Sequence, residues 1–467
     1  METVDQDKKQ SGMFILADGT NAAFTFALVS SLFLLWGFCN GMIDTMDKHF
    51  QEALHLSLAQ SANVQWAHYL GYFLMALPAG WLATKTGYKG GIITGLLMVG
   101  VGGCWFIPAT HIGQFWAFLL GVCFIAAGLT FLETIANPYT TVLGQTRYAA
   151  TRINLAQSCN GIGWIFGPIA GSLFFYAKDS SGASTGSQTL WIPYFGVAVV
   201  VIILAIIFFF ANIPDIKTED DYHLDDDDSP ASGGAAAAET APIPSSHSIW
   251  SHPHFVFAVA AQFFYVAAQA GIFAFFINYM TKETPAIPDS IKSILRPAWT
   301  ETGDHGLQHF SNAFASILSS VGFLFFLAGR FSGAALLKKV PAHKMLGIYA
   351  LTNVAICALI VAKLGWISAA AVFLSYFFMS IMFPTIFALG IFGLGLRAKK
   401  ASSFIVMAIM GGAILPKLMG FIADQHGMSA GYVVPMACFA FIAIYAFLWP
   451  RLSGVESMQS QVNVSGH

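Results

Sequence analysis

The stretch PDIKTEDDYHLDDDDSPASGGAAAAETAPIPSSHSIWS, residues 214–251, decides the fold of this sequence. It is polar and contains four consecutive aspartates at 225–228, four consecutive alanines and several prolines. A segment of this composition cannot bury a hydrophobic core, which predicts a solvated linker, with an acidic regulatory site as the alternative. The linker divides the chain into two halves, residues 1–213 and 252–467.

Both halves are far more apolar than a soluble protein. Of the 467 residues, 56% are hydrophobic and 10% are charged, whereas about a quarter of the residues in soluble domains are charged. A helix that crosses a bilayer needs about twenty mostly apolar residues. Each half contains six such runs, at 22–47, 62–84, 91–109, 113–142, 153–177 and 190–212, and at 252–280, 309–336, 344–362, 366–396, 402–423 and 430–450.

The two halves also repeat each other. NPYTTVLG at 137–144 is answered by FPTIFALG at 383–390, and GPIAG at 167–171 by LPKLMG at 415–420. The prolines lie within apolar runs and are expected to kink the helices. Parallel six-helix repeats that hold a substrate between them are the plan of major facilitator transporters. The sequence therefore predicts an all-α integral membrane protein, with twelve transmembrane helices in two pseudo-symmetric bundles.

The positive charges predict the orientation. If both termini are cytoplasmic, the inner loops contain ten Lys and Arg residues and the outer loops contain six. Cytoplasmic loops carry the excess of Lys and Arg. We therefore expect a multi-pass plasma membrane protein whose termini and linker are cytoplasmic.

Other features exclude some classes of function. The six cysteines lie in apolar runs without CxxC spacing, which predicts reduced packing residues and neither a disulfide nor a zinc site. The first twenty residues lack an apolar core and cleavage site, so we expect no removed signal peptide. No basic cluster suits nucleic acid, and the partners expected are the lipid bilayer and a small solute.

Two carboxyl groups lie inside predicted spans, at Asp44 and Glu133. A charge inside a bilayer is costly, so an ionisable residue there is a candidate for a functional site. A carboxyl group in a low dielectric favours its neutral form and can load and release a proton. Asp44 has an alternative interpretation, in which it faces water with Asp47 and Lys48 at the outer end of the first helix. The same alternative is weaker for Glu133, because uncharged sequence flanks it on both sides.

Amide side chains accompany Glu133. Asn137 follows it by four residues, so both lie on one helix face. Acid and amide groups suit hydrogen bonding to sugar hydroxyls. The next span adds a stripe of Asn154, Gln157 and Asn160, which either lines a polar cavity or joins helices.

The second half offers a matching set of polar side chains: Gln262, Tyr265, Gln269, Asn278 and Tyr376. Amides beside aromatic faces suit a sugar site, although aromatic residues in such a chain more often face lipid or pack. Lys417 is unusual within a span; it either snorkels to the outer surface or pairs with a cavity carboxylate.

Several segments closely resemble the fucose:proton symporter family of the major facilitator superfamily, in the same order along nearly the whole membrane part. They are LLWGFCNGMID (34–44), GYFLMALPAGWLATKTGYKGGIITGL (71–96), LETIANP (132–138), INLAQSCNGIG (153–163), AGRFSG (328–333), FPTIFALG (383–390) and SSFIVMAIMGGAI (402–414). The resemblance implies that Asp44 and Glu133 couple proton and sugar, that Gln157, Asn160 and the polar positions of the seventh helix line the sugar cavity, and that the two halves rock in alternating access.

The sequence departs from the family pattern in three places. Met42 and Ile43 precede Asp44 where the family usually has Leu-Asn, which leaves the sugar identity open. Thr84 and Lys85 replace the Asp-Arg of the superfamily's gating motif. The loop from Thr281 to His305 is longer than in fucose permeases.

These observations favour secondary active transport over an enzyme. No Walker motif is present, and we assign no catalytic residue, metal or cofactor other than the coupling proton. The prediction is a monomeric symporter in a bacterial inner membrane that imports a hexose or 6-deoxyhexose, first of all L-fucose. The alternatives are a glucose/galactose symporter of the same family, a sugar facilitator without proton coupling, a membrane enzyme and a transporter-derived sensor.

Overall fold

The fold is described from a computed structural model of the chain. The structure describes residues 13–16, 19–144, 149–177, 186–214, 249–292, 295–302, 307–337, 340–392, 394 and 398–454. The predicted linker lies outside these residues, apart from Pro214 and Ile249–Ser251, so its extent stays a prediction.

The first half forms one bundle of long helices. Its elements are α2 (Ala23–Ala53), α3 (Leu58–Ser61), α4 (Asn63–Ile112), α5 (Phe115–Val142), α6 (Ala149–Phe174), α7 (Gly186–Thr189) and α8 (Trp191–Phe210). The helix α4 contains two of the predicted spans, which meet at Gly87. The backbone there has φ +70°, a conformation that glycine adopts without the steric cost of a Cβ atom.

The second half forms the other bundle, and several of its spans are broken into two helices. Its elements are η2 (Ile249–Ser251), α9 (Pro253–Ala274), α10 (Phe276–Lys282), α11 (Asp289–Lys292), η3 (Pro297–Trp299), β1 (Thr300–Thr302), β2 (Gln308–Phe310), α12 (Asn312–Leu337), α13 (Ala342–Val361), α14 (Trp366–Met379), α15 (Met382–Ile391), α16 (Ala398–Met407), η6 (Ala408–Met410), α17 (Gly411–His426), α18 (Met428–Gly431) and α19 (Val433–Leu452). The break between α14 and α15 precedes Pro384, where a kink was predicted.

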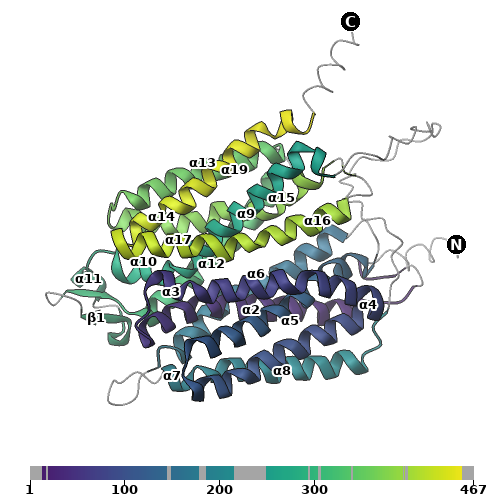
Figure 1. Cartoon of the computed structure of the whole chain (residues 1–467), viewed down its shortest axis with the longest axis horizontal. Helices are drawn as coiled ribbons and strands as arrows, with labels where there is room; N and C mark the ends of the chain where they lie inside the picture. Colours follow the sequence, from purple (N-terminus) through teal and green to yellow (C-terminus); the bar gives the residue numbers. More distant parts are fainter. Residues whose placement is uncertain are drawn as a thin grey trace, which may run out of the picture.

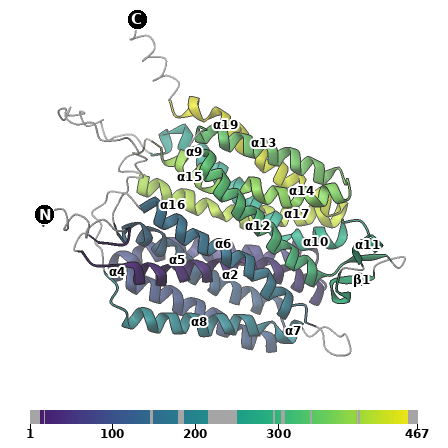
Figure 2. The ribbon, with the colours of Figure 1, turned by 180° about the vertical axis from the view of Figure 1, so that it is seen from behind.

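The two bundles lie side by side (Figures 1 and 2). Each encloses a hydrophobic core of its own, one centred on α2, α4 and α5 and the other on α9, α13 and α19. We call the end of the molecule that contains α3, α10 and the antiparallel β1–β2 hairpin the α3 end (Figure 1). The helix α2 begins and α19 ends at the opposite, terminal end.

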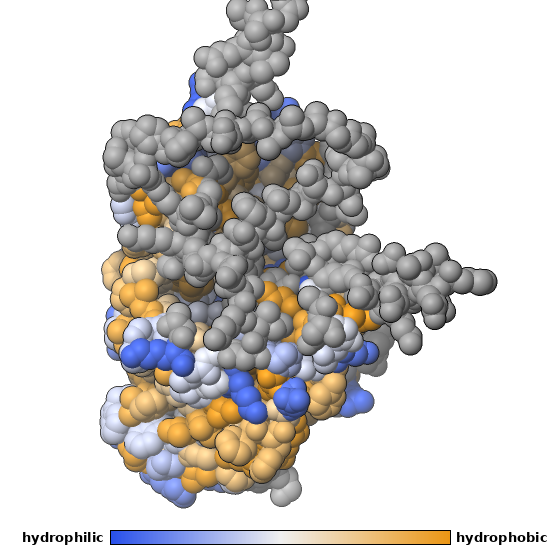
Figure 3. Space-filling view, turned by 90° about the vertical axis from the view of Figure 1, so that its right-hand side faces the viewer, coloured by the Kyte–Doolittle hydropathy of each residue, from blue (hydrophilic) through white to orange (hydrophobic). Residues whose placement is uncertain are grey.

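The outer faces of both bundles suit lipid. Phe210, Leu173 and Phe331 are 80%, 66% and 61% exposed, which in water would leave large apolar surfaces unburied. Ten of the described helical segments are long and apolar enough to cross a bilayer. With residues 63–86 of α4 and the more polar α6, they complete the twelve predicted spans. Figure 3 looks onto the terminal end, where hydrophilic side chains gather between apolar ones.

The structure tests two predictions, on where the first helix ends and on the state of the cysteines. The first helix was predicted to end at residue 47, whereas α2 continues to Ala53, and Lys48, His49 and Gln51 in this extension are buried. All six cysteines are free thiols. The long loop between α10 and α12 contains α11, η3 and the β1–β2 hairpin.

Candidate functional site

A row of polar side chains on α2 faces α4. Trp36, Asn40 and Asp44 are each four residues apart, so they share one face of the helix. The indole Nε1 of Trp36 donates to the Tyr72 hydroxyl at 2.7 Å. The Gln65 amide Nε2 donates to Asp44 Oδ1 at 2.8 Å. These two bonds fix the row against α4 inside the first bundle.

Asp44 does not sit at a water-facing helix end. The helix α2 continues for more than two turns beyond it, and the next two polar residues, Asp47 and Lys48, are 0% and 2% exposed. The second carboxyl oxygen of Asp44 is buried and has no hydrogen-bond partner among the described residues. The interpretation in which Asp44 faces water with Asp47 and Lys48 is therefore wrong, because Asp47 and Lys48 are buried.

Glu133, Asn137 and Gln157 come together where α5 meets α6. The Asn137 side-chain Nδ2 donates to the Glu133 backbone carbonyl at 3.1 Å. The Gln157 Nε2 donates to Asn137 Oδ1 at 3.1 Å. All three residues keep some exposure, and no described side chain hydrogen-bonds to the Glu133 carboxyl group. Its oxygens are thus available to a ligand.

Tyr69 on α4 connects the two carboxyl groups. Its phenol lies within electrostatic range of the Asp44 and Glu133 carboxyl groups. Tyr265 belongs to α9 of the second bundle and donates to the Met379 carbonyl at 3.0 Å. Tyr69 also contacts the second bundle at Gly412. The two acids therefore flank an aromatic side chain at the junction of the bundles.

Aromatic rings form the facing surface. The Trp164 ring on α6 lies 4.8 Å from Phe323 and 5.7 Å from Phe273, both in the second bundle. Phe273 in turn stacks on Tyr376 at 4.6 Å, and Tyr376 lies within electrostatic range of Asp44. Flat apolar rings beside carboxyl and amide groups can hold the apolar face of a sugar ring while its hydroxyls are bonded.

The polar residues predicted on the second bundle are mostly buried. Gln262 and Asn278 are fully buried, and neither amide group has a partner among the described residues. The Tyr376 hydroxyl is likewise buried and unpaired, whereas Gln269 is partly exposed. Buried amides without partners are rare and require an explanation. A rearrangement that brings them to a ligand or to water would provide one.

Two members of the α6 stripe differ from the rest. Asn160 is 4% exposed, and its Nδ2 donates to the Phe33 carbonyl of α2 at 3.3 Å, as expected of a residue that joins helices. The side chain of Asn154 lies outside the described part of the chain. Neither observation tests sugar binding, so both assignments stay predictions.

Three residues of the site were not predicted from the sequence: Gln65, Tyr69 and Trp164. Gln65 is 2% exposed. The signal that could have identified it is a Gln within the span that follows the helix of Asp44. No group of three or more His, Cys, Asp and Glu suited to a metal occurs among the residues described.

Hydrogen bonds join the bundles at the α3 end. They run between α2 or α6 of the first bundle and α12 of the second, and they use short hydroxyl side chains and backbone carbonyls. The bonds are Thr45 Oγ1 with Ser316 Oγ at 3.2 Å, Ser316 to Pro168 O, Ser320 to Ile165 O and Ser172 to Ala313 O, each of the last three at 2.7 Å.

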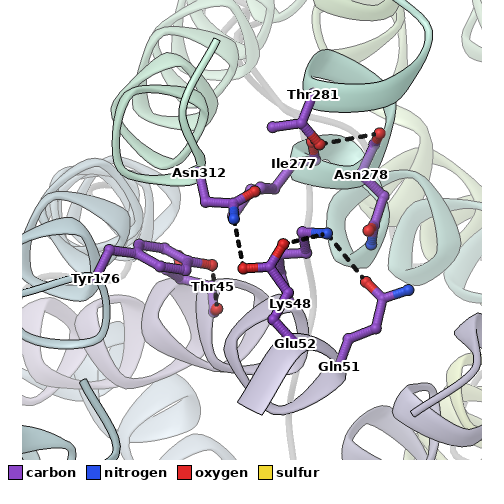
Figure 4. Close-up of polar contacts among 9 residues, drawn as sticks. All are labelled: Thr45, Lys48, Gln51, Glu52, Tyr176, Ile277, Asn278, Thr281 and Asn312. Atoms are coloured by element: carbon purple, nitrogen blue, oxygen red, sulfur yellow. Dashed lines mark hydrogen bonds and ion pairs between the residues drawn. The ribbon is translucent and has the colours of Figure 1, made fainter. Parts of the chain in front are cut away.

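Charged groups extend this junction (Figure 4). Glu52 lies 2.9 Å from Lys48 Nζ and accepts a hydrogen bond from Asn312 of the second bundle at 2.5 Å. Asp424 on α17 accepts from the backbone N–H groups of Leu58 and Ala59 at 2.8 and 3.0 Å. All cross-bundle hydrogen bonds that the structure describes lie toward the α3 end, which is therefore closed.

Lys417 belongs to the same junction. Its side chain is exposed, and Nζ donates to Asn63 Oδ1 at 3.2 Å. Lys417 thus follows the predicted surface interpretation, and it contacts an amide of the other bundle instead of a cavity carboxylate.

Two membrane bundles with acids, amides and aromatic rings where they meet define a secondary transporter. A model of the Major Facilitator Superfamily matches residues 24–284. The chain belongs to that superfamily.

Its relatives confirm the resemblance seen in the motifs. The chain is 34% identical to the L-fucose-proton symporter of Escherichia coli over 95% of both chains. It is 30% identical to a glucose/galactose transporter of Brucella abortus, over 92% of this chain and 94% of that one. The solved E. coli fucose:proton symporter in the outward conformation matches with a TM-score of 0.63 at 34% identity, over 91% of this chain and 99% of that one.

Proposed function

We propose that this chain is a proton-coupled symporter that imports a hexose or 6-deoxyhexose, with L-fucose as the first candidate. The observation that carries the proposal is the pair of acids Asp44 and Glu133 inside the first bundle, one held by Gln65 and the other beside Asn137 and Gln157. It is supported by 34% identity to an L-fucose-proton symporter along the whole membrane part. No catalytic role is assigned to any residue.

We assign sugar binding to the first bundle's carboxyl–amide group. Glu133, Asn137 and Gln157 offer both donors and acceptors, as sugar hydroxyls require. Trp164 and Phe273 offer apolar ring faces. Asp44, which is held by Gln65, is a proton-coupling group together with Glu133. Asn154, Asn160, Gln262, Gln269, Asn278 and Tyr376 stay candidates for the sugar site.

Alternating access follows from the closed α3 end. With both termini in the cytoplasm, as the Lys and Arg distribution predicts, the closed end faces outward, as it does in an inward-facing state. Opening to the outside requires the cross-bundle hydrogen bonds to break. The chain is a multi-pass membrane protein, and we place it as a monomer in a bacterial inner membrane.

The test is the sugar-induced alkalinisation of a weakly buffered suspension of deenergised cells that express the chain. Fucose, galactose, glucose and mannose are offered separately. Alkalinisation by one sugar, abolished in Glu133→Gln, supports proton symport and identifies the substrate. Entry of labelled sugar without proton movement leaves a facilitator, and entry of none of these sugars places the substrate outside them.

A glucose/galactose symporter is the second candidate. The chain is 30% identical to a glucose/galactose transporter over 92% of its length, and Ile43 lacks the polar side chain of the Asn expected in the family pattern. Competition of labelled fucose uptake by excess glucose or galactose distinguishes the two.

A further inference from the structure

Asp47 is a buried acid that the coupling scheme above does not use. It lies one helical turn beyond Asp44 on α2 and is 0% exposed. Neither of its carboxyl oxygens has a hydrogen-bond partner among the described residues. The Ser61 hydroxyl lies beside it but donates to the Leu58 carbonyl at 3.1 Å. An ionised carboxylate in such a site lacks both water and donors, which is strongly unfavourable.

Among the described residues, no free base neutralises the charge of Asp47. Lys48 is the neighbouring base, but its Nζ lies 2.9 Å from Glu52 and 3.3 Å from Gln51 Oε1 (Figure 4). The remaining titratable group in range is the Tyr176 phenol, which donates to the Thr45 carbonyl at 3.1 Å. Lys282 and Glu301 act on Lys48 from the second bundle with opposite signs. The charge of Lys48 is therefore already matched by Glu52.

Asp44 and Asp47 are then two acids without a cation of their own. Residues three apart on a helix have Cβ atoms about 5–6 Å apart. Two like charges at that distance in a low dielectric disfavour each other, so such a pair holds one proton between its members. Gln65 donates to Asp44 at 2.8 Å, and this favours the ionised form of Asp44. The proton consequently belongs on Asp47, whose carboxyl oxygens have no hydrogen-bond donor among the described residues.

We propose that Asp47 is a second proton-binding carboxyl group of the coupling site and shares one proton with Asp44. In the state described here the proton resides on Asp47, and Asp44 is ionised and bonded to Gln65. When the α3 end opens, the pair exchanges this proton with water. The proposal rests on the proposed proton symport and names a further residue for it.

The experiment measures sugar binding and sugar-linked proton uptake by the purified full-length protein as a function of pH. The probe is the sugar that the alkalinisation test identifies. In Asp47→Asn, Asp44 loses its like-charged neighbour and gives up its proton at lower pH. We expect the alkaline midpoint of both profiles to fall by about two pH units, from the Coulomb energy at that separation with an effective dielectric of about 20. Asp47→Glu retains the titrating group and is expected to keep the wild-type midpoint to within about half a unit.

Glu301→Gln is the charge-matched control. It removes one acid from the same end of the molecule, but Glu301 is exposed on β1, so water screens its charge. An unchanged midpoint in Asp47→Asn, or an equal shift in Glu301→Gln, overturns the proposal while symport stands. Absence of sugar-linked proton uptake in the wild type overturns both.

A second measurement covers the case in which Asp47→Asn does not fold. Infrared spectroscopy detects the carbonyl band of a protonated carboxyl group, and this band differs between Asp and Glu side chains. We expect part of the band in the wild type to move in Asp47→Glu. An identical band in the two proteins shows that Asp47 does not hold the proton, and overturns the proposal.

Discussion

Asp424→Ala is expected to open the α3 end. The Asp424 carboxylate on α17 accepts two backbone N–H bonds from α3 of the other bundle, at 2.8 and 3.0 Å. A net contribution of about 1 kcal/mol per bond is typical, and exposure of Asp424 reduces it. A loss of about 1–2 kcal/mol in total increases the ratio of open to closed molecules about 5- to 30-fold.

The assay is the distance distribution between two spin labels at the α3 end. Ala53 on α2 and Gln425 on α17 are both exposed and belong to different bundles, so labels at these positions report the separation of the bundles. A longer-distance population is expected to grow in Asp424→Ala.

Glu283 offers a matched control. Its carboxylate also accepts two hydrogen bonds, from Ser429 N at 3.1 Å and Ser429 Oγ at 3.0 Å, but within one bundle. Glu283→Ala is expected to leave the distribution unchanged. The reasoning is refuted if Asp424→Ala leaves the distances as they are, or if Glu283→Ala shifts them equally.

Three further predictions concern the site. Glu133→Gln removes the titratable group and is expected to reduce sugar-induced alkalinisation to background, measured with a pH electrode; retention of more than about half the signal contradicts the coupling role. Gln65→Leu removes the donor at 2.8 Å from Asp44, worth about 1.5–3 kcal/mol when the acceptor is charged. The pH profile of transport should therefore move to higher pH by about one to two units, and Gln65→Asn should restore part of it. Asn160→Ala loses one interhelical hydrogen bond and is expected to lower the free energy of unfolding by about 0.6 kcal/mol, with unchanged sugar affinity. If sugar affinity falls and stability does not, Asn160 instead belongs to the sugar site.

The sequence predicted the spans well because a long apolar run in lipid must form a helix. Every backbone N–H and C=O inside a bilayer must bond within the protein, which dictates helices. The same reasoning misplaced the end of α2. Lys48, His49 and Gln51 are polar enough to suggest a loop, yet they are 2%, 5% and 7% exposed. Their burial depends on packing against residues distant in the sequence, such as Phe175 and Tyr176 beside His49, which local composition does not contain.

The predicted site was assembled only in part for a similar reason. Glu133 and Asn137 are four residues apart on one helix, so their contact follows from helical geometry. The contact of Asp44 with Gln65 joins different helices, and Tyr69 lies within electrostatic range of both acids only because α2, α4 and α5 pack together. Gln262 was selected from the sequence as a polar residue, but its burial without a hydrogen-bond partner among the described residues could not be predicted from the sequence.

The junction at the α3 end is suited to repeated opening because of the kind of bond it uses. Ser172, Ser316 and Ser320 donate to backbone carbonyls, and each such bond contributes only about 0.5–1.5 kcal/mol, since water replaces it when the bundles part. The buried carboxyl groups differ from these serines. At mid-bilayer no water replaces a lost hydrogen-bond donor, so the carboxyl group binds a proton instead. The junction can thus keep the two states within a few kcal/mol of each other. Protonation of the Asp44 pair and occupancy beside Glu133 then decide which state is populated.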